Sequence, residues 1–317
     1  MRDQVLKDIE ILINGVLNSD KRVIAKTLTK VENETSDSEE LLEELYKHTG
    51  KAHRIGITGP PGAGKSTLTN NLIKLLSSLG KKVGVIAVDP TSPFTGGALL
   101  GDRIRMQESG LLENVFIRSM ATRGSLGGLC KNVVEASDVL DAAGMDFIII
   151  ETVGVGQSEL DIAQTADTVI VVLVPESGDA VQAMKAGLME IADIFVLNKS
   201  EREGADAVAA TIKNIIHLKP ATEDGWIINV LKTVGSKNEG TEELFKEIEK
   251  HRNHLLDSGF IRKRRMLHLE KKVIDLVNNK LKVNFWDKEK TQLLTNRLES
   301  MIDRDENPYS FVKSLLS

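Results

Sequence analysis

The spacing of hydrophobic positions changes twice along the chain and predicts three regions. In residues 1–50, apolar side chains such as Val5, Ile9 and Leu12 recur at three- and four-residue steps, as on one face of an α-helix. We expect two or three helices there. Residues 260–317 show the same spacing without strand-like runs, which predicts a C-terminal helical arm.

Between these regions, short runs of apolar and β-branched residues alternate with helical segments. The runs are residues 54–58, 83–88, 147–150, 169–174, 194–197 and 226–231. Strands that lack polar alternation are buried on both faces, which is typical of a parallel sheet covered by helices. The pattern therefore predicts an α/β fold with a mostly parallel sheet. In such sheets, ligands bind at the carboxyl ends of the strands.

The first predicted strand is followed by a phosphate-binding motif. Residues 59–66, GPPGAGKS, match G-x-x-x-x-G-K-[ST], and a predicted helix follows at 66–79. Glycines let backbone N–H groups turn toward the phosphates, and the helix N-terminus adds partial positive charge. We expect Lys65 to reach the β and γ phosphates and Ser66 to bind Mg²⁺. The motif predicts a P-loop NTPase.

Acidic residues at the strand ends are candidate partners for the metal. Asp89 and Glu151 end two predicted strands, and Asp102 follows a loop rich in Pro and Gly. Mg²⁺ prefers oxygen ligands and keeps several waters, so one hydroxyl with nearby carboxylates suits it. Glu151 also begins a D-x-x-G-like element whose Gly154 would sense the γ-phosphate. The loop that contains Gly154 and Gln157 is a candidate switch, and both Glu151 and Gln157 are candidates for orienting the attacking water.

Residues 195–204, FVLNKSEREG, predict recognition of guanine. Asn198 and Lys199 follow a buried run, and Glu201 stands where N-K-x-D motifs have Asp. A carboxylate there accepts hydrogen bonds from guanine N1–H and N2–H₂, whereas adenine presents an unprotonated N1. We therefore expect GTP to be preferred over ATP, by a smaller margin than Asp would give. Backbone amides around Val234 or Gly235 are expected to donate to guanine O6, and Ser236 is a further residue expected to bind the nucleotide.

Composition removes several classes of function. A net charge of -5 and a pI near 5.8 do not indicate a basic surface that binds nucleic acid. The basic run at 262–265 is therefore interpreted as a solvated helix face or a subunit contact. Cys130 is the only cysteine, which excludes disulfides within the chain and favours a cytoplasmic setting. No signal peptide or membrane span is expected. His251 and His254 are interpreted as part of a solvated helix.

Four motifs together resemble the MeaB/ArgK/MMAA-type P-loop GTPases. They are residues 59–67 (GPPGAGKST), 88–93 (VDPTSP), 97–106 (GALLGDRIRM) and 151–159 (ETVGVGQSE). The resemblance implies a P-loop GTPase domain at 51–258, an N-terminal helical segment at 1–50 and a C-terminal helical dimerisation arm at 259–317.

The same resemblance implies a function. We expect a GTPase with low intrinsic activity that serves as chaperone to an adenosylcobalamin-dependent acyl-CoA mutase of the methylmalonyl-CoA mutase type. The resemblance further implies that it works as a homodimer, depends on Mg²⁺, and meets cobalamin only through its partner. The family pattern gives catalytic roles to Lys65, Asp102 and Glu151, places Ser66, Asp89, Asp102 and Glu151 around Mg²⁺, and adds a switch segment at 174–187 with Asp179 and Lys185.

Two rival functions share the P-loop class. A nickel-insertion GTPase typically carries His-rich or Cys/His sites, and a small-molecule kinase needs an acceptor pocket; the sequence shows neither. The residues expected to bind the nucleotide are Gly59, Pro60, Pro61, Gly62, Ala63, Gly64, Lys65, Ser66, Thr67, Asn198, Lys199, Glu201, Val234, Gly235 and Ser236.

Overall fold

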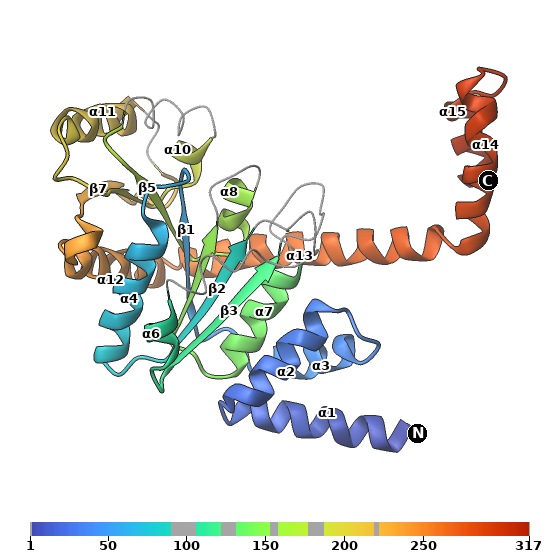
Figure 1. Ribbon diagram of the computed structural model, residues 1–317, viewed down its shortest axis with the longest axis horizontal. Helices are drawn as coiled ribbons and strands as arrows, with labels where there is room; N and C mark the ends of the chain where they lie inside the picture. Colours follow the sequence, from blue (N-terminus) through green and yellow to red (C-terminus); the bar gives the residue numbers. More distant parts are fainter. Residues whose placement is uncertain are drawn as a thin grey trace. The chain divides into compact units, whose positions relative to one another are not determined.

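The computed structural model describes residues 2–89, 106–121, 131–152, 158–176, 187–218 and 222–316 (Figure 1). The chain divides into two compact units, Met1–Arg264 and Arg265–Ser317. The first contains the sheet and the three N-terminal helices. The second consists, in its described residues, of helices joined by short turns.

A seven-stranded parallel sheet forms the centre of the first unit, which confirms the predicted fold class. The strands are β1 (His53–Thr58), β2 (Val83–Asp89), β3 (Val115–Ala121), β4 (Phe147–Thr152), β5 (Thr168–Leu173), β6 (Ile194–Leu197) and β7 (Asn229–Lys232). Their order across the sheet is β3-β2-β4-β1-β5-β6-β7, and each neighbouring pair is parallel. The carboxyl ends of all seven strands therefore meet at one edge.

Helices connect the strands and cover the sheet. In the first unit they are α1 (Arg2–Leu17), α2 (Lys21–Glu32), α3 (Ser38–Tyr46), α4 (Lys65–Ser78), α6 (Gln107–Gly110), α7 (Lys131–Ala142), α8 (Ser158–Asp161), η1 (Ile162–Gln164), α10 (Leu188–Ile191), α11 (Ala205–Leu218), η2 (Gly235–Lys237) and α12 (Thr241–Asp257). Helix α13 (Phe260–Phe285) begins in the first unit, and α14 (Lys288–Ile302) and α15 (Pro308–Leu316) complete the second.

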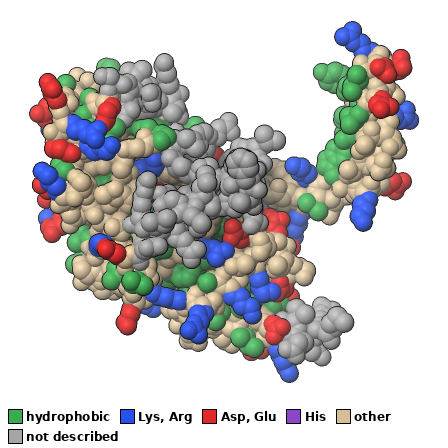
Figure 2. Space-filling model, in the orientation of Figure 1, with side chains coloured by type: hydrophobic (Ala, Val, Ile, Leu, Met, Phe, Trp, Pro, Cys, Tyr) green, Lys and Arg blue, Asp and Glu red, His purple; other side chains and the backbone are tan. Residues whose placement is uncertain are grey.

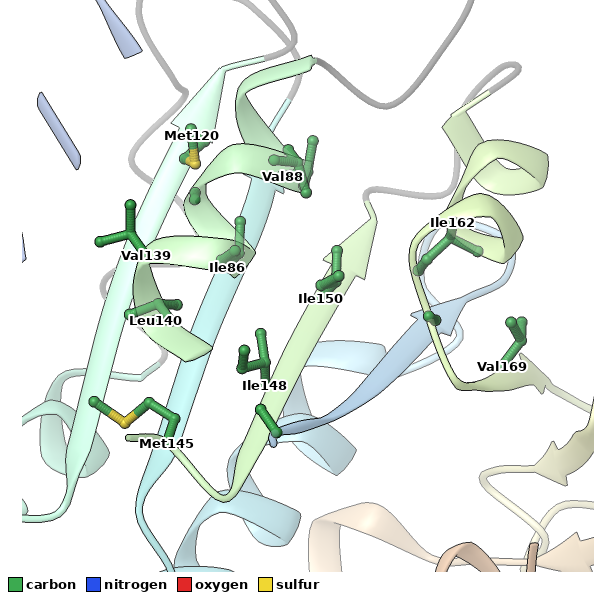
Figure 3. Close-up of a cluster of buried hydrophobic side chains, with 14 of the residues drawn as sticks. Ile86, Val88, Met120, Val139, Leu140, Met145, Ile148, Ile150, Ile162 and Val169 are labelled. Carbon is green, nitrogen blue, oxygen red and sulfur yellow. The ribbon is translucent and has the colours of Figure 1, made fainter. Parts of the chain in front are cut away.

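Alternate residues of each central strand enter two separate hydrophobic cores. In β4, Ile148 and Ile150 pack toward α7 and η1 (Figure 3), whereas Phe147 and Ile149 pack toward α4 and α12. All four side chains are buried. Apolar residues are needed at every position because both faces are covered, as the runs without polar alternation predicted.

The three N-terminal helices extend the first of these cores. Val16, Ile24, Leu28 and Leu41 are fully buried in the same cluster as Val133 of α7. Helix α7 therefore lies between the sheet and residues 1–46. The amphipathic spacing at the start of the chain thus predicted the helices and their buried faces.

The sequence pattern missed strand β3. Val115–Ala121 pairs with β2 along its whole length, at the edge of the sheet. Arg118 interrupts the apolar run and forms an ion pair with Glu32 of α2, with 2.5 Å between nitrogen and oxygen. An edge strand has one side without a neighbouring strand, so it tolerates polar residues and lacks the continuous apolar signal.

The interpretation of His251 as part of a solvated helix is wrong. His251 lies on α12 with no exposed surface, and its Nδ1 is 2.8 Å from the Thr168 hydroxyl, which is 2.8 Å from His53 Nε2. Its Nε2 lies 3.4 Å from Asp193. Its ring packs against Trp226, which lies outside β7 although the run 226–231 predicted a strand there.

Arg264 also departs from a solvated helix face, which is one of the two interpretations of the basic run at 262–265. Its two terminal nitrogens donate to both carboxylate oxygens of Asp193, at 2.8 and 2.9 Å, and one donates to the Asp167 carbonyl at 2.6 Å. A bidentate pair of this kind is a strong charge-assisted contact. The first turn of α13 is therefore anchored to the amino ends of β5 and β6.

No helix among the described residues is both long enough and apolar enough to cross a membrane.

We predict that His251 makes folding stability depend on pH. Burial lowers the pKa of His251 below its ordinary value of 6.5. The negative charges of Asp193 and Asp224 raise this pKa, whereas the positive charges of Arg264 and His254 lower it further, and the net effect is a lowered pKa. The unfolded chain therefore takes up this proton near pH 6.5, whereas the folded chain does so only at lower pH. As the pH falls below 6.5, protonation therefore favours the unfolded state, and the free energy of unfolding decreases.

Urea unfolding at about pH 7.5 and 5.5 measures this effect. The pH-dependent loss should shrink in His251→Asn and stay as in the native chain in His48→Asn, whose ring is exposed. Equal losses in all three proteins would contradict the assignment to His251.

Candidate nucleotide-binding site

The phosphate loop connects β1 to α4 at the carboxyl edge of the sheet. Gly64 caps α4 in a left-handed conformation with φ 88°, and a Cβ there would lie 2.3 Å from Nδ2 of Asn198. Only glycine satisfies both the backbone angle and the close approach. The final glycine of the motif therefore brings the phosphate loop against the segment that follows β6.

Lys65 points back into the loop. Its side chain is buried, and Nζ donates to the carbonyls of Gly59 at 2.8 Å and Pro60 at 3.1 Å. The ammonium thus lies within the turn, beside the N-terminus of a 14-residue helix whose dipole favours anions. Charge and backbone are arranged as phosphate binding requires.

Ser66 connects the phosphate loop to β4. Its hydroxyl donates to Oε1 of Glu151 at 2.6 Å, and both side chains are buried. Glu151 pairs in register with Ile57 of β1 and Ala87 of β2, so it lies at the central strands of the edge. A hydroxyl and a carboxylate oxygen this close are the kind of donors that Mg²⁺ prefers, so these residues fit the expected metal.

The remaining expected metal ligands are not brought together by the described residues. Asp89 is the last residue of β2, and its side chain lies outside the description, as does the whole of Asp102. In the described ranges, no group of three or more His, Cys, Asp or Glu side chains is arranged so that it could hold a metal ion. Four switch candidates, Gly154, Gln157, Asp179 and Lys185, also lie outside them.

Two threonines join β4 to β1 close to the Ser66–Glu151 contact. Thr152 Oγ1 donates to Thr58 Oγ1 at 2.9 Å, with both side chains fully or nearly fully buried. The bond connects the last residue of β4 to the last residue of β1. Glu151 and the start of the phosphate loop are therefore held at neighbouring positions.

Asn198 connects the predicted base site to the phosphate loop. Its Nδ2 donates to the Ala63 carbonyl at 2.8 Å, and its Oδ1 accepts from Gly235 N and Thr233 Oγ1, each at 3.0 Å. The side chain is only 2% exposed. One amide therefore joins the segments after β1, β6 and β7, which are distant in sequence.

The other base-site candidates surround Asn198. Lys199 has φ 55°, an uncommon angle for a residue other than glycine, and Ser200 N donates to the Thr233 carbonyl at 3.1 Å. Glu201 follows this turn and is exposed, so its carboxylate is open to a base. Val234 and Gly235 are buried, whereas Ser236 is exposed.

Comparison with known proteins identifies the class of this site. The family model described as methylmalonyl Co-A mutase-associated GTPase MeaB matches residues 24–290. This chain belongs to the MeaB family. It is therefore a P-loop GTPase, and it hydrolyses GTP, as its relatives' names also indicate.

Several relatives resemble this MeaB-family chain over most of its length. A Pyrococcus horikoshii protein with GTPase in its name is 47% identical and covers 96% of each chain. The GTPase ArgK of Escherichia coli is 37% identical over 78% of this chain and 77% of its own. The crystal structure of an LAO/AO transport system kinase is 28% identical, with a TM-score of 0.71 and coverage of 97% and 96%.

Sequence reasoning missed two features of this MeaB-family site. Asn71 of α4 donates from Nδ2 to the Gly235 carbonyl at 2.8 Å, and Thr58 and Thr152 form their buried pair. Asn70 and Asn71 interrupt the apolar spacing of the helix, but a polar pair on a half-buried face is also common at a solvated helix surface. Only the position of η2 against α4 shows what Asn71 contacts.

We predict that Lys65→Ala lowers affinity for GDP and GTP by about 100-fold or more. The reason is the loss of charge-assisted bonds to phosphate, each worth about 1.5–3 kcal/mol. Titration calorimetry measures the affinity. Lys74→Ala, which removes an exposed lysine from the same helix, is the control and should bind as the native chain does. Undiminished affinity in Lys65→Ala would refute the role.

Proposed function

We propose that this GTPase is the chaperone of an adenosylcobalamin-dependent acyl-CoA mutase of the methylmalonyl-CoA mutase type. Its GTP cycle times the loading of the cofactor and protects the loaded mutase. The observation that carries the proposal is the match of residues 24–290 to a mutase-associated GTPase family. A mouse relative, 33% identical over 82% of this chain, is named for methylmalonic aciduria.

The residues described above account for the phosphate chemistry. Lys65 and the N-terminus of α4 offset the charge that develops on the γ-phosphate as water attacks it. Ser66 and Glu151 would hold Mg²⁺, with Asp89 and Asp102 as further partners. Bound Mg²⁺ would supply positive charge that offsets the charge of the phosphates. Cobalamin is met only through the mutase.

A low intrinsic rate is part of this proposal, and the contact of Glu151 supports it. Its Oε1 is already bonded to Ser66, which favours a role at the metal over a role in orienting the attacking water. Gln157 and the segments around Gly154, Asp179 and Lys185 remain the candidates for the switch that a partner would order. We therefore propose that contact with the mutase completes the catalytic arrangement.

A homodimer formed through the C-terminal helices is part of this proposal. The described residues of α13 and α14 include no buried side chain. Their exposed apolar residues include Val273, Val277, Leu281, Leu293 and Leu298. Figure 2 shows hydrophobic side chains along the segment formed by α14 and α15. Such a row at helical spacing is typical of a surface that a second copy covers.

We predict that purified methylmalonyl-CoA mutase raises GTP turnover by this chain at least ~10-fold. Contact with the mutase is expected to order the group that positions the attacking water. Phosphate release at saturating GTP and Mg²⁺, with and without mutase, measures the effect. Light scattering of the chain alone should give about twice its mass of 34.8 kDa.

Lys65→Ala serves as the control because it should release no phosphate with or without mutase. The chaperone proposal would fail if the mutase neither changed turnover nor bound in a nucleotide-dependent way. A single-chain mass would overturn the homodimer alone.

A further inference from the structure

Val234 and the first two residues of the short helix η2 after β7, Gly235 and Ser236, are the three residues of this segment that are expected to bind the nucleotide. Val234 N donates to the Glu239 carbonyl at 3.1 Å, and Gly235 N donates to Oδ1 of Asn198 at 3.0 Å. Within the described part of the chain, the amide of Ser236 has no such acceptor. Of the three candidates, Ser236 N–H is therefore the donor left for a ligand.

The direction of that amide is set by the carbonyl of the same peptide unit. Gly235 C=O and Ser236 N–H belong to one planar trans peptide, in which the two groups point in opposite directions. The Gly235 carbonyl accepts from Nδ2 of Asn71 at 2.8 Å and from Asn238 N at 3.2 Å. Because Asn71 holds the carbonyl toward α4, the Ser236 N–H points away from α4.

Helix α4 therefore supports both ends of the nucleotide site. Its first residues, Lys65 and Ser66, belong to the phosphate loop, and Asn71 lies on the same helix about 9 Å further along its axis. Close packing strengthens the link, since a Cβ on Gly235 would lie 3.4 Å from side-chain atoms of both Thr67 and Leu68. The distance from phosphate loop to base donor is thus fixed by one rigid element.

We propose that Asn71 is a positioning residue for guanine recognition, which holds the Gly235 carbonyl so that Ser236 N–H donates to guanine O6. This inference rests on the base site predicted around Asn198 and Glu201. A donor at this point favours the O6 acceptor of guanine and disfavours the N6 amino group of adenine. It works together with the Glu201 carboxylate, which accepts from the neighbouring N1–H and N2–H₂ groups on the same edge of the base.

The test compares binding of GDP with binding of 6-thio-GDP, in which sulfur, a weaker acceptor, replaces O6. The native chain should bind GDP about 10-fold more tightly, which corresponds to roughly one hydrogen bond. In Asn71→Ala and Asn71→Leu, this ratio should fall at least ~3-fold, because the amide is no longer held in place. Both replacements suit a helix, so α4 should persist.

Asn70→Ala is the matched control. Asn70 is the neighbouring half-buried asparagine of α4 and accepts a hydrogen bond from the Ser109 hydroxyl, away from η2. Its ratio should equal that of the native chain. The proposal would be overturned if the Asn71 variants bound GDP and 6-thio-GDP more weakly by the same factor, so that the ratio did not change. Asn71 would then have only a structural role. A native chain that binds ATP and GTP equally would instead refute the base site itself.

Discussion

The buried side-chain amide of Asn198 is the contact on which the geometry of the nucleotide site depends. It donates to the phosphate loop at Ala63 and accepts from Thr233 and Gly235 after β7. These segments are distant in sequence, and each is a turn with little regular structure of its own. A buried amide left without partners would cost about 1–3 kcal/mol, so the three turns are held in one arrangement.

This constraint explains why glycine occurs at two particular positions. A Cβ on Gly64 would lie 2.3 Å from Asn198 Nδ2, and one on Gly235 would lie 3.3 Å from its Oδ1. Both loops can therefore close around the amide only when they carry no bulky side chain there. On the other side, Ser66 and Glu151 connect the phosphate loop to the central strand β4. The site is thus built from strand ends whose positions the sheet has already fixed.

Much of this arrangement was predictable from the sequence because its signals are local. Continuous apolar runs predicted the buried strands, and the glycine-rich motif between a strand and a helix predicted the phosphate loop. The edge strand β3 was missed because Arg118 breaks its apolar pattern. His251 and Arg264 were assigned to solvated surfaces because a short sequence window contains neither Thr168 nor Asp193, their partners across the fold. The role of Asn71 likewise depends on a contact between residues 164 positions apart.

The central claim is that the phosphate loop and the turn at Asn198–Glu201 form one guanine-selective site. Competition between GTP and ATP for the native chain, with Mg²⁺ present, tests it most directly. The account predicts that GTP binds at least ~100-fold more tightly, because ATP would leave the Glu201 carboxylate and the Ser236 N–H without partners on the base. It also predicts that Glu201→Asp increases the preference for GTP over ATP. Equal affinities for the two nucleotides in the native chain would contradict the claim.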